Sequence, residues 1–229
     1  HQSNSMLACD WQRIINGVYD EDDAIKASAF FQKLDEEIIQ SRRLQIQRTL
    51  IDALNPSRET ILIALQPDEW LSWEGALAGA LKPLDVLGQC CSNFPDFNIV
   101  PTFHKDITGL PSTVLSELKL TYPNIVDLPT EILTNCTEAL LPVVEHVYTV
   151  SSATGLSALL YGKCLISDSF SYLTGGAITT EDFIAGQRSH LQQKQQANLA
   201  AFLLGRYCKN VAELHSFDEY RKHKRLISV

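Results

Sequence analysis

Residues 146–166 read HVYTVSSATGLSALLYGKCLI, and this stretch decides the fold. It begins with a short apolar run, His146–Val150, whose β-branched residues are typical of a strand buried on both faces. A helical stretch over 155–160 follows, and Gly162 marks its end before a second apolar run, Cys164–Ile166. A strand, a helix and a strand in close succession predict a crossover between parallel strands of one sheet.

Apolar runs of the same kind occur at three earlier places in the chain. They are Thr60–Leu65, Phe97–Phe103 and, more weakly, Asn124–Leu128. Helix-like segments separate them, at about 69–91, 112–120 and 131–143. We therefore predict an α/β fold in which flanking helices cover a Rossmann-like parallel sheet of about five strands.

The 229 residues are predicted to form one sheet domain between two helical parts. Apolar residues recur at three- and four-residue steps from Asp20 to Leu54, which predicts a helix there. A second helical stretch is predicted from Thr180 to His223, and its first turn is acidic. The expected parts are a helical N-terminal segment over 1–56, the Rossmann-like domain over 57–178 and C-terminal packing helices over 179–229. Residues 1–5 are typical of a tag remnant.

Composition and charge argue against several classes of protein. The chain is 45% hydrophobic, and its 19 basic and 27 acidic residues give a net charge of −8, without the basic surplus of a protein that binds nucleic acid. No apolar stretch reaches the roughly 18 residues of a membrane span, and no signal segment opens the chain. The six cysteines form no C-x-x-C pair and lie mostly in apolar runs, which indicates a reducing, cytoplasmic location.

The segment after the first predicted strand lacks two common nucleotide-binding motifs. Gln66-Pro67-Asp68-Glu69 contains no glycine, so it is neither a G-x-G-x-x-G fingerprint nor a P-loop. This argues against a dehydrogenase, a classical methyltransferase and a P-loop kinase. The chain also offers no compact cluster of histidine and aspartate, and we expect neither a metal nor a cofactor.

Polar residues at the other strand ends are candidates for binding, because ligands of such sheets lie beyond the carboxyl ends of the strands. After the second strand, His104 and Lys105 offer two donors to an anion. After the fourth, Ser151, Ser152 and Thr154 open a helix with hydroxyls and free N–H groups, a combination that suits a phosphate. A simple helix cap is the alternative for these hydroxyls.

Two further features concern the approach of the chain to such a ligand. Gly155 would let the helix start close to the sheet. After the fifth strand, the loop Ser167–Gly176 is rich in hydroxyls, contains Tyr172 and ends in two glycines. It either closes over a ligand or forms a surface turn.

These strand-end residues resemble the bacterial capsule polysaccharide biosynthesis family, in particular its retaining β-Kdo glycosyltransferases. The resemblance rests on Gln66, the pair His104-Lys105 and the motif YTVSSATGLSALLYGKCLI followed by DSFSYLTGG, and it covers about Ile61 to Gly176, roughly half the chain. It implies a GT-B-like, two-lobed glycosyltransferase. The carboxyl-terminal, Rossmann-like lobe of such an enzyme binds a CMP-activated sugar, and this is the lobe that the chain resembles.

The resemblance also implies roles for single residues. Ser151, Ser152 and Thr154 would hold the CMP phosphate, and His104 would be the histidine near it, in a catalytic role. The family usually has proline after that histidine, whereas this chain has Lys105. The other candidates for donor binding are Gly155, Lys105, Gln66 and Tyr172.

The implied reaction is transfer of an acidic sugar, Kdo, from CMP to a glycan acceptor during capsule or lipopolysaccharide assembly. It places the protein in the bacterial cytoplasm, in peripheral association with the inner face of the membrane. Only about 55 residues precede the first predicted strand, so no acceptor lobe is found, and we expect the chain to be one lobe of a longer protein.

Two other hypotheses remain open from the sequence. One is a glycosyltransferase that uses a UDP- or GDP-sugar, or CMP-sialic acid, at the same hydroxyl cluster. The other is a non-catalytic interaction domain that docks a partner through its long polar helices, 20–54 and 180–206.

Overall fold

The computed structural model describes residues 10–19, 22, 25, 29, 41–67, 82–104, 107, 112–169, 173 and 175–203. Its strands are β1 (Thr60–Leu65), β2 (Asn98–Phe103), β3 (His146–Thr149) and β4 (Cys164–Ile166). Its helices are α2 (Trp11–Ile15), α4 (Ser41–Ala53), α6 (Pro83–Asn93), α7 (Ser112–Thr121), α8 (Thr130–Asn135), α9 (Thr137–Leu140), the 3₁₀ turn η1 (Leu141–Val143), α10 (Thr154–Leu160), α11 (Thr180–Ile184) and α12 (Gln193–Ala201).

The four strands form one parallel sheet in the order β2-β1-β3-β4. The central strand, β1, pairs with β2 from Thr60 opposite Asn98 to Leu65 opposite Phe103, and with β3 from Ile61 opposite His146. All six residues of β1 are buried, as expected of a strand covered on both faces. The predicted α/β class with a Rossmann-like sheet is confirmed.

The prediction of a fifth strand over 124–128 is wrong, because that segment forms only an isolated bridge between Ile125 and Ile99 of β2. Pro123 and Pro129 flank the segment, and each removes a backbone N–H that a longer ladder would need. A second bridge joins Ile166 of β4 to Ile178. With both bridges counted, the six segments follow the 3-2-1-4-5-6 order of a doubly wound sheet.

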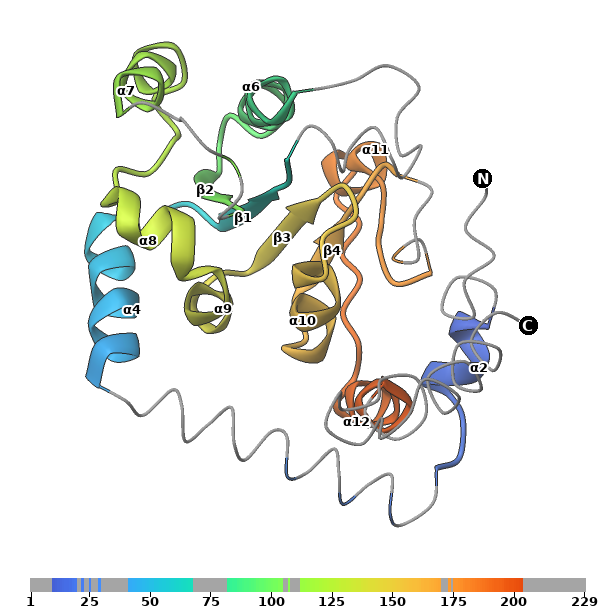
Figure 1. Cartoon of the computed structure of the whole chain (residues 1–229). Coiled ribbons are helices and arrows are strands. Elements are labelled where there is room, and N and C mark those ends of the chain that lie inside the picture. The colour runs from blue at the N-terminus through green and yellow to red at the C-terminus, as the bar shows by residue number, and fades with distance from the viewer. Residues whose placement is uncertain are drawn as a thin grey trace, which may run out of the picture.

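Helices cover both faces of the sheet (Figure 1). On one face lie α6, which connects β1 to β2, and α11, whose Phe183 meets Phe94 at the end of α6 with ring centroids 5.4 Å apart. On the other face lies α10, which connects β3 to β4 and packs against α9 and α12. Outside these, α4 packs on α9 and α2 on α12.

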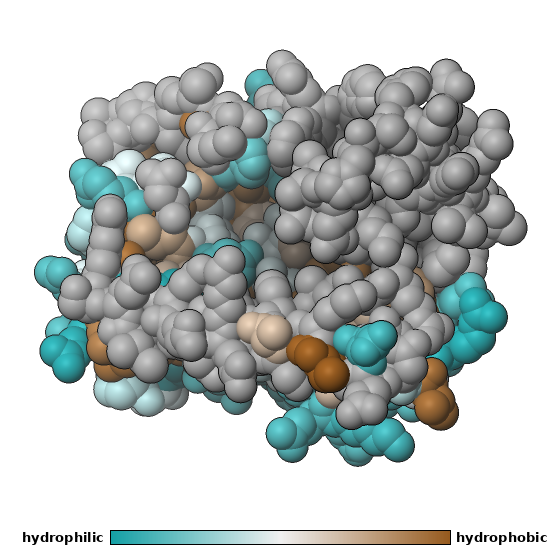
Figure 2. Space-filling model, turned by 60° about the horizontal axis from the view of Figure 1, so that its bottom comes forward, coloured by the Kyte–Doolittle hydropathy of each residue, from teal (hydrophilic) through white to brown (hydrophobic). Residues whose placement is uncertain are grey.

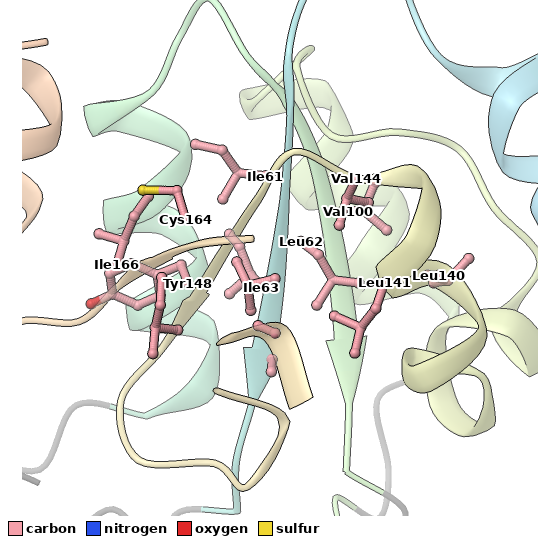
Figure 3. Packing of buried hydrophobic residues seen from close by; sticks show 14 of the residues in the cluster. Ile61, Leu62, Ile63, Val100, Leu140, Leu141, Val144, Tyr148, Cys164 and Ile166 are labelled. Atoms are coloured by element: carbon pink, nitrogen blue, oxygen red, sulfur yellow. The ribbon is translucent and has the colours of Figure 1, made fainter. Parts of the chain in front are cut away.

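Alternate side chains of the strands supply the two apolar layers, which Figure 3 shows from close by. Leu62 and Val100 lie on the side of Leu140, Leu141 and Val144, the face of α9 and η1. On the opposite side lie Ile61, Ile63, Tyr148, Cys164 and Ile166. Each of these residues is buried, so the core is continuous through the sheet.

The C-terminal helical prediction from Thr180 to His223 is corrected within the described residues, which end at 203. Helix α11 ends at Ile184, and Gly186 follows with φ of 89°, a left-handed conformation that stops a helix. The chain then runs without helix to Gln192, where α12 starts. The cap of α11 is Thr179, one residue before the predicted start, and its hydroxyl accepts a hydrogen bond from the Asp182 N–H.

Three of the cysteines are core residues, as their apolar sequence context predicts. Cys90, Cys91 and Cys164 are buried, and burial raises the pKa of each thiol, to about 12 for Cys91. A fourth, Cys136, is half-buried, and no disulfide joins these four. Cys9 and Cys208 lie outside the described residues.

Trp11 joins the N-terminal helix α2 to the segment that follows β4. A Cβ atom added to Gly175 would lie 2.4 Å from Trp11 Cγ, and one added to Gly176 would lie 2.6 Å from Trp11 Cζ2. The predicted glycine pair therefore lets the indole pack directly on the backbone. The chain after the carboxyl end of β4 is thus anchored to α2.

The surface view in Figure 2 shows hydrophobic side chains as separate patches bordered by hydrophilic ones among the coloured residues. Within the described part of the chain, no helix is both long and apolar enough to cross a bilayer.

His146, the first residue of β3, is buried among aromatic rings at the amino edge of the sheet. Its ring lies 4.9 Å from that of Phe183 and 6.0 Å from that of Phe97, and its Nε2 lies 3.1 Å from Glu59 Oε2. Nδ1 is buried without a hydrogen-bond partner among the described residues. Protonation would therefore place an unsatisfied N–H in the core, and burial lowers the pKa of His146 although Glu59 opposes the shift.

This burial predicts a stability that falls in mild acid. An unfolded histidine has a pKa of about 6.5, so the unfolded chain takes up the proton first, and folding stability decreases as pH falls below about 6.5. We expect His146→Gln to remove that part of the pH dependence between pH 7.5 and 5.5 in urea unfolding. His190→Gln, at an exposed histidine, should keep the dependence of the wild type. Equal slopes for wild type and His146→Gln would contradict this role.

Candidate functional site

The strand order reverses between β1 and β3, and this switch point lies among the predicted site residues. The chain leaves β1 toward β2 on one side, and it leaves β3 toward β4 on the other. Gln66 and Ser151 come just after these two strands, so they face each other at the carboxyl edge. Ligands of doubly wound sheets bind in the crevice at this place, because the two connecting segments diverge there.

Gln66 and Ser151 are joined across the switch point by two hydrogen bonds. Gln66 Oε1 accepts from the Ser151 backbone N–H at 2.9 Å and from the Ser151 hydroxyl at 3.2 Å. Only 5% of Gln66 and 2% of Ser151 are exposed. This buried pair therefore joins the carboxyl ends of β1 and β3.

Ser152 and Thr154 form the accessible part of the hydroxyl cluster. Both are half-buried, and their hydroxyl oxygens lie 3.2 Å apart, with Ser152 as donor. Ser152 Oγ also accepts a hydrogen bond from the Thr154 N–H at 3.2 Å, a local turn contact, whereas the N-cap of α10 is Ala153 and no side chain caps the helix. Among the described residues, the Thr154 hydroxyl has no acceptor for its own proton. It is the donor in this cluster best placed for a ligand.

Gly155 lies beneath this cluster and has a packing role. A Cβ atom at this position would lie 2.7 Å from Leu173 Cδ1 and 3.3 Å from Thr149 Cγ2. The glycine thus lets α10 start against the segment that follows β4, in agreement with its predicted close approach. Helix α10 itself has seven residues and ends at Leu160, and Gly162 follows the C-cap with φ of 67°, in agreement with the predicted stop.

His104 follows β2 at the same edge. Its backbone N–H donates to Leu65 O at 3.3 Å, which places it beside the end of β1, and its side chain is half-buried. Lys105 and Tyr172, the other two predicted site residues, lie outside the described residues. The structure therefore places Gln66, His104, Ser151, Ser152, Thr154 and Gly155 at the same carboxyl edge of the sheet.

The start of the hydroxyl-rich loop after β4 contributes polar contacts whose partners the sequence did not predict. The hydroxyls of Ser167 and Ser169 both donate to Val150 O, the first at 3.1 Å. Asp168 accepts from the backbone N–H and the hydroxyl of Thr180, each at 2.6 Å, and from the Tyr148 hydroxyl at 3.4 Å. Three polar residues directly after a buried strand indicate in the sequence that this segment is polar. Their hydrogen-bond partners lie 12 or more residues away in the chain, so the pattern does not predict them.

Asp168 and burial together affect Tyr148. Burial raises the pKa of this phenol well above its usual range, and the neighbouring Asp168 carboxylate opposes its ionisation as well. Tyr148 is therefore a neutral hydrogen-bond donor that helps to fix the start of α11 through Asp168.

Lys163, which ends the family-like motif, lies away from the cluster. It precedes β4 at the amino edge of the sheet, and its Nζ donates to Pro142 O at 3.1 Å. Burial lowers its pKa. The motif thus contains both the residues of the carboxyl edge and a lysine at the amino edge, where its hydrogen bond to Pro142 O fixes the end of the β3–β4 connection.

The described residues hold no group of three or more histidine, cysteine, aspartate or glutamate side chains that could bind a metal.

Comparisons with known proteins found similar solved structures only. No family model matches the chain, and no curated protein matches it. One similar structure is Thermosulfurimonas dismutans KpsC, β-Kdo 2,4 transferase. It aligns with a TM-score of 0.42 at 17% identity, and the alignment covers 82% of this chain and 59% of that chain. The β-Kdo 2,7 transferase of the same KpsC aligns with a TM-score of 0.45 at 17% identity, over 84% and 56%. Both solved structures are named as Kdo transferases, and this chain spans less than two thirds of the length of each.

The Gln66–Ser151 pair predicts a measurable loss of stability. In Gln66→Leu, the N–H and hydroxyl of Ser151 lose this acceptor in a buried place, and an unmet buried donor costs about 1–3 kcal/mol. We expect the free energy of unfolding in urea to fall by about that amount. Gln45→Leu, on the exposed face of α4, should leave it within about 0.5 kcal/mol of the wild type. An unchanged midpoint for Gln66→Leu would show that the pair does not hold the strand ends.

Proposed function

We propose that this chain is the donor-binding lobe of a glycosyltransferase that uses a CMP-linked acidic sugar, Kdo, in surface polysaccharide assembly. The observation that carries the proposal is the Ser152–Thr154 hydroxyl pair at the switch point of a doubly wound sheet, with His104 following the neighbouring strand β2 at the same edge. The sequence resemblance of the same residues to the β-Kdo glycosyltransferases supports the choice of donor.

The residues of the cluster fit the departure of a phosphate. When the sugar leaves CMP, negative charge develops on the single phosphate, and donors already aimed at it stabilise that charge. The Thr154 hydroxyl, with its oxygen held by Ser152, is such a donor. His104 would donate to the leaving oxygen as its imidazolium form or as the neutral N–H tautomer.

Gln66 and Ser151 act indirectly in this proposal. They are buried and bonded to each other, so they are positioning residues that fix the edge from which Ser152 and Thr154 project. With a net charge of −8, the chain as a whole repels an anionic donor. Attraction must therefore come from these local groups, with Lys105 and Tyr172 as further proposed contacts.

The proposal also covers the context of the reaction. The acceptor is a glycan, the acceptor lobe belongs to a longer protein, and the enzyme works at the inner face of the bacterial membrane without a metal or cofactor. The division of the chain at 56/57 and 178/179 into a helical segment, a nucleotide-sugar domain and packing helices stays a prediction.

Calorimetric titration with CMP tests the choice of nucleotide. We expect CMP to bind, and UDP and GDP to compete only weakly, because a single phosphate fits a cluster with few donors. Tighter binding of UDP or GDP would favour a transferase that uses a nucleotide-diphosphate sugar. Absence of heat and of thermal stabilisation with all three nucleotides at millimolar concentration, in this chain and in a longer form of the protein, would contradict the proposal.

Removal of the two accessible hydroxyls tests the site itself. We expect Ser152→Ala combined with Thr154→Ala to weaken CMP binding by roughly 1–3 kcal/mol, the scale of lost hydrogen bonds to a charged group, without unfolding the chain. Ser92→Ala combined with Thr121→Ala is the matched control, because those hydroxyls donate only to carbonyls of their own helices. Unchanged affinity for CMP in a folded Ser152/Thr154 double variant would show that these hydroxyls do not bind the phosphate.

A further inference from the structure

A polar hollow lies at the amino edge of the sheet, opposite the edge of the proposed nucleotide site. It has a volume of about 330 Å³, at the small end of the range for small-molecule sites. One wall is the end of α4 and the turn that leads into β1, and the other is the segment before α8. Asn98, the first residue of β2, lies between them.

Asn98 fixes the first wall. Only 4% of it is exposed, and its Nδ2 donates to Asn55 O at 3.0 Å and to Arg58 O at 2.9 Å, while its Oδ1 accepts from the Asn55 N–H at 3.1 Å. The Arg58 N–H closes the turn on Asn55 O at 3.1 Å. A buried amide thus holds irregular backbone in place, and Arg58 lies at the rim of the hollow on a rigid support.

Asn124 fixes the second wall in the same way. It is 7% exposed, its Nδ2 donates to Phe94 O at 3.0 Å and to Cys91 O at 3.2 Å, and its backbone O accepts from the Ile99 N–H at 2.8 Å. The wall ends in Asp127, whose carboxylate pairs with Lys119. The hollow is therefore formed in advance, by two buried asparagines that brace its sides.

The charges on the two walls are complementary in chemistry. Arg58 is exposed and forms no ion pair with any described acidic side chain, so its five N–H donors are available. Asp127 offers carboxylate oxygens on the opposite side, and its charge is partly offset by Lys119. Asn55, in the same turn as Arg58, also lines the hollow, and its Oδ1 accepts from the Ser57 N–H and hydroxyl.

We propose that this hollow binds one hydroxylated carboxylate unit, an acidic sugar, by placing the carboxylate on Arg58 and ring hydroxyls on Asp127. Guanidinium and carboxylate match in a fork geometry, and a carboxylate side chain accepts from hydroxyls. Asp127 disfavours a doubly charged phosphate more than a singly charged carboxylate. This is a second saccharide site, on the far edge of the sheet from the proposed nucleotide site, and it does not depend on the nucleotide proposal.

The test is titration of the ¹⁵N-labelled chain with D-galacturonate, followed by amide chemical shifts. We expect the shifts to gather at Asn55, Ser57, Arg58, Asn98 and residues 124–127, and we expect D-galactose and acetate each to bind at least tenfold more weakly. Arg58→Gln should weaken galacturonate at least tenfold. Arg48→Gln, at an exposed arginine of α4 outside the hollow, should leave the affinity unchanged.

Asp127→Asn separates sugar binding from simple anion binding. We expect this variant to lose much of the preference for galacturonate over acetate, because the hydroxyls lose their charged acceptor. Equal affinity of acetate and galacturonate in the wild type would overturn the proposal, and so would shifts that are absent or gather elsewhere. CMP titration of Arg58→Gln should match the wild type, so failure here is distinguishable from failure of the nucleotide proposal.

Discussion

The rest of the structure depends on the burial of β1 between two parallel neighbours. Its six residues are buried on both faces, and its backbone pairs with β2 on one side and β3 on the other. Because the chain leaves β1 toward β2 on one side and leaves β3 toward β4 on the other, the two connecting segments diverge. That divergence creates the crevice at the carboxyl edge, so the candidate site follows from the pairing of one strand.

At both edges of the sheet, buried side chains form hydrogen bonds with backbone groups that the strand ladder leaves unpaired. Where the ladder stops, backbone N–H and C=O groups lose their partners, and buried ones must find others. At the carboxyl edge Gln66, Thr149 and Ser167 supply them, with Thr149 Oγ1 donating to Ala64 O at 3.1 Å. At the amino edge Asn98 and Asn124 do so. Both candidate binding places therefore lie on backbone that buried polar side chains have made rigid.

The strands were predicted well from the sequence, and the reason is physical. Strands buried on both faces require continuous apolar runs, so β1, β2, β3 and β4 lie within the predicted runs, to within one residue at each end. The weak run at 124–128 failed as a strand because only Ile125 bridges to β2. Helix lengths were less predictable, since Gly186 ended α11 early inside a stretch that is helical by composition.

The residues of the candidate site could be predicted from the sequence, but the contact that each of them makes could not. The sequence by itself determined an α/β sheet, the absence of glycine-rich phosphate loops, and hydroxyl or imidazole groups directly after the strands. Only the tertiary structure decided that Ser151 faces Gln66 across the switch point, while the Thr154 hydroxyl accepts from Ser152 and has no acceptor for its own proton among the described residues. The same is true of the hollow between Arg58 and Asp127. Such pairings join residues far apart in the chain, and local patterns of hydrophobicity carry no information about which of them will meet.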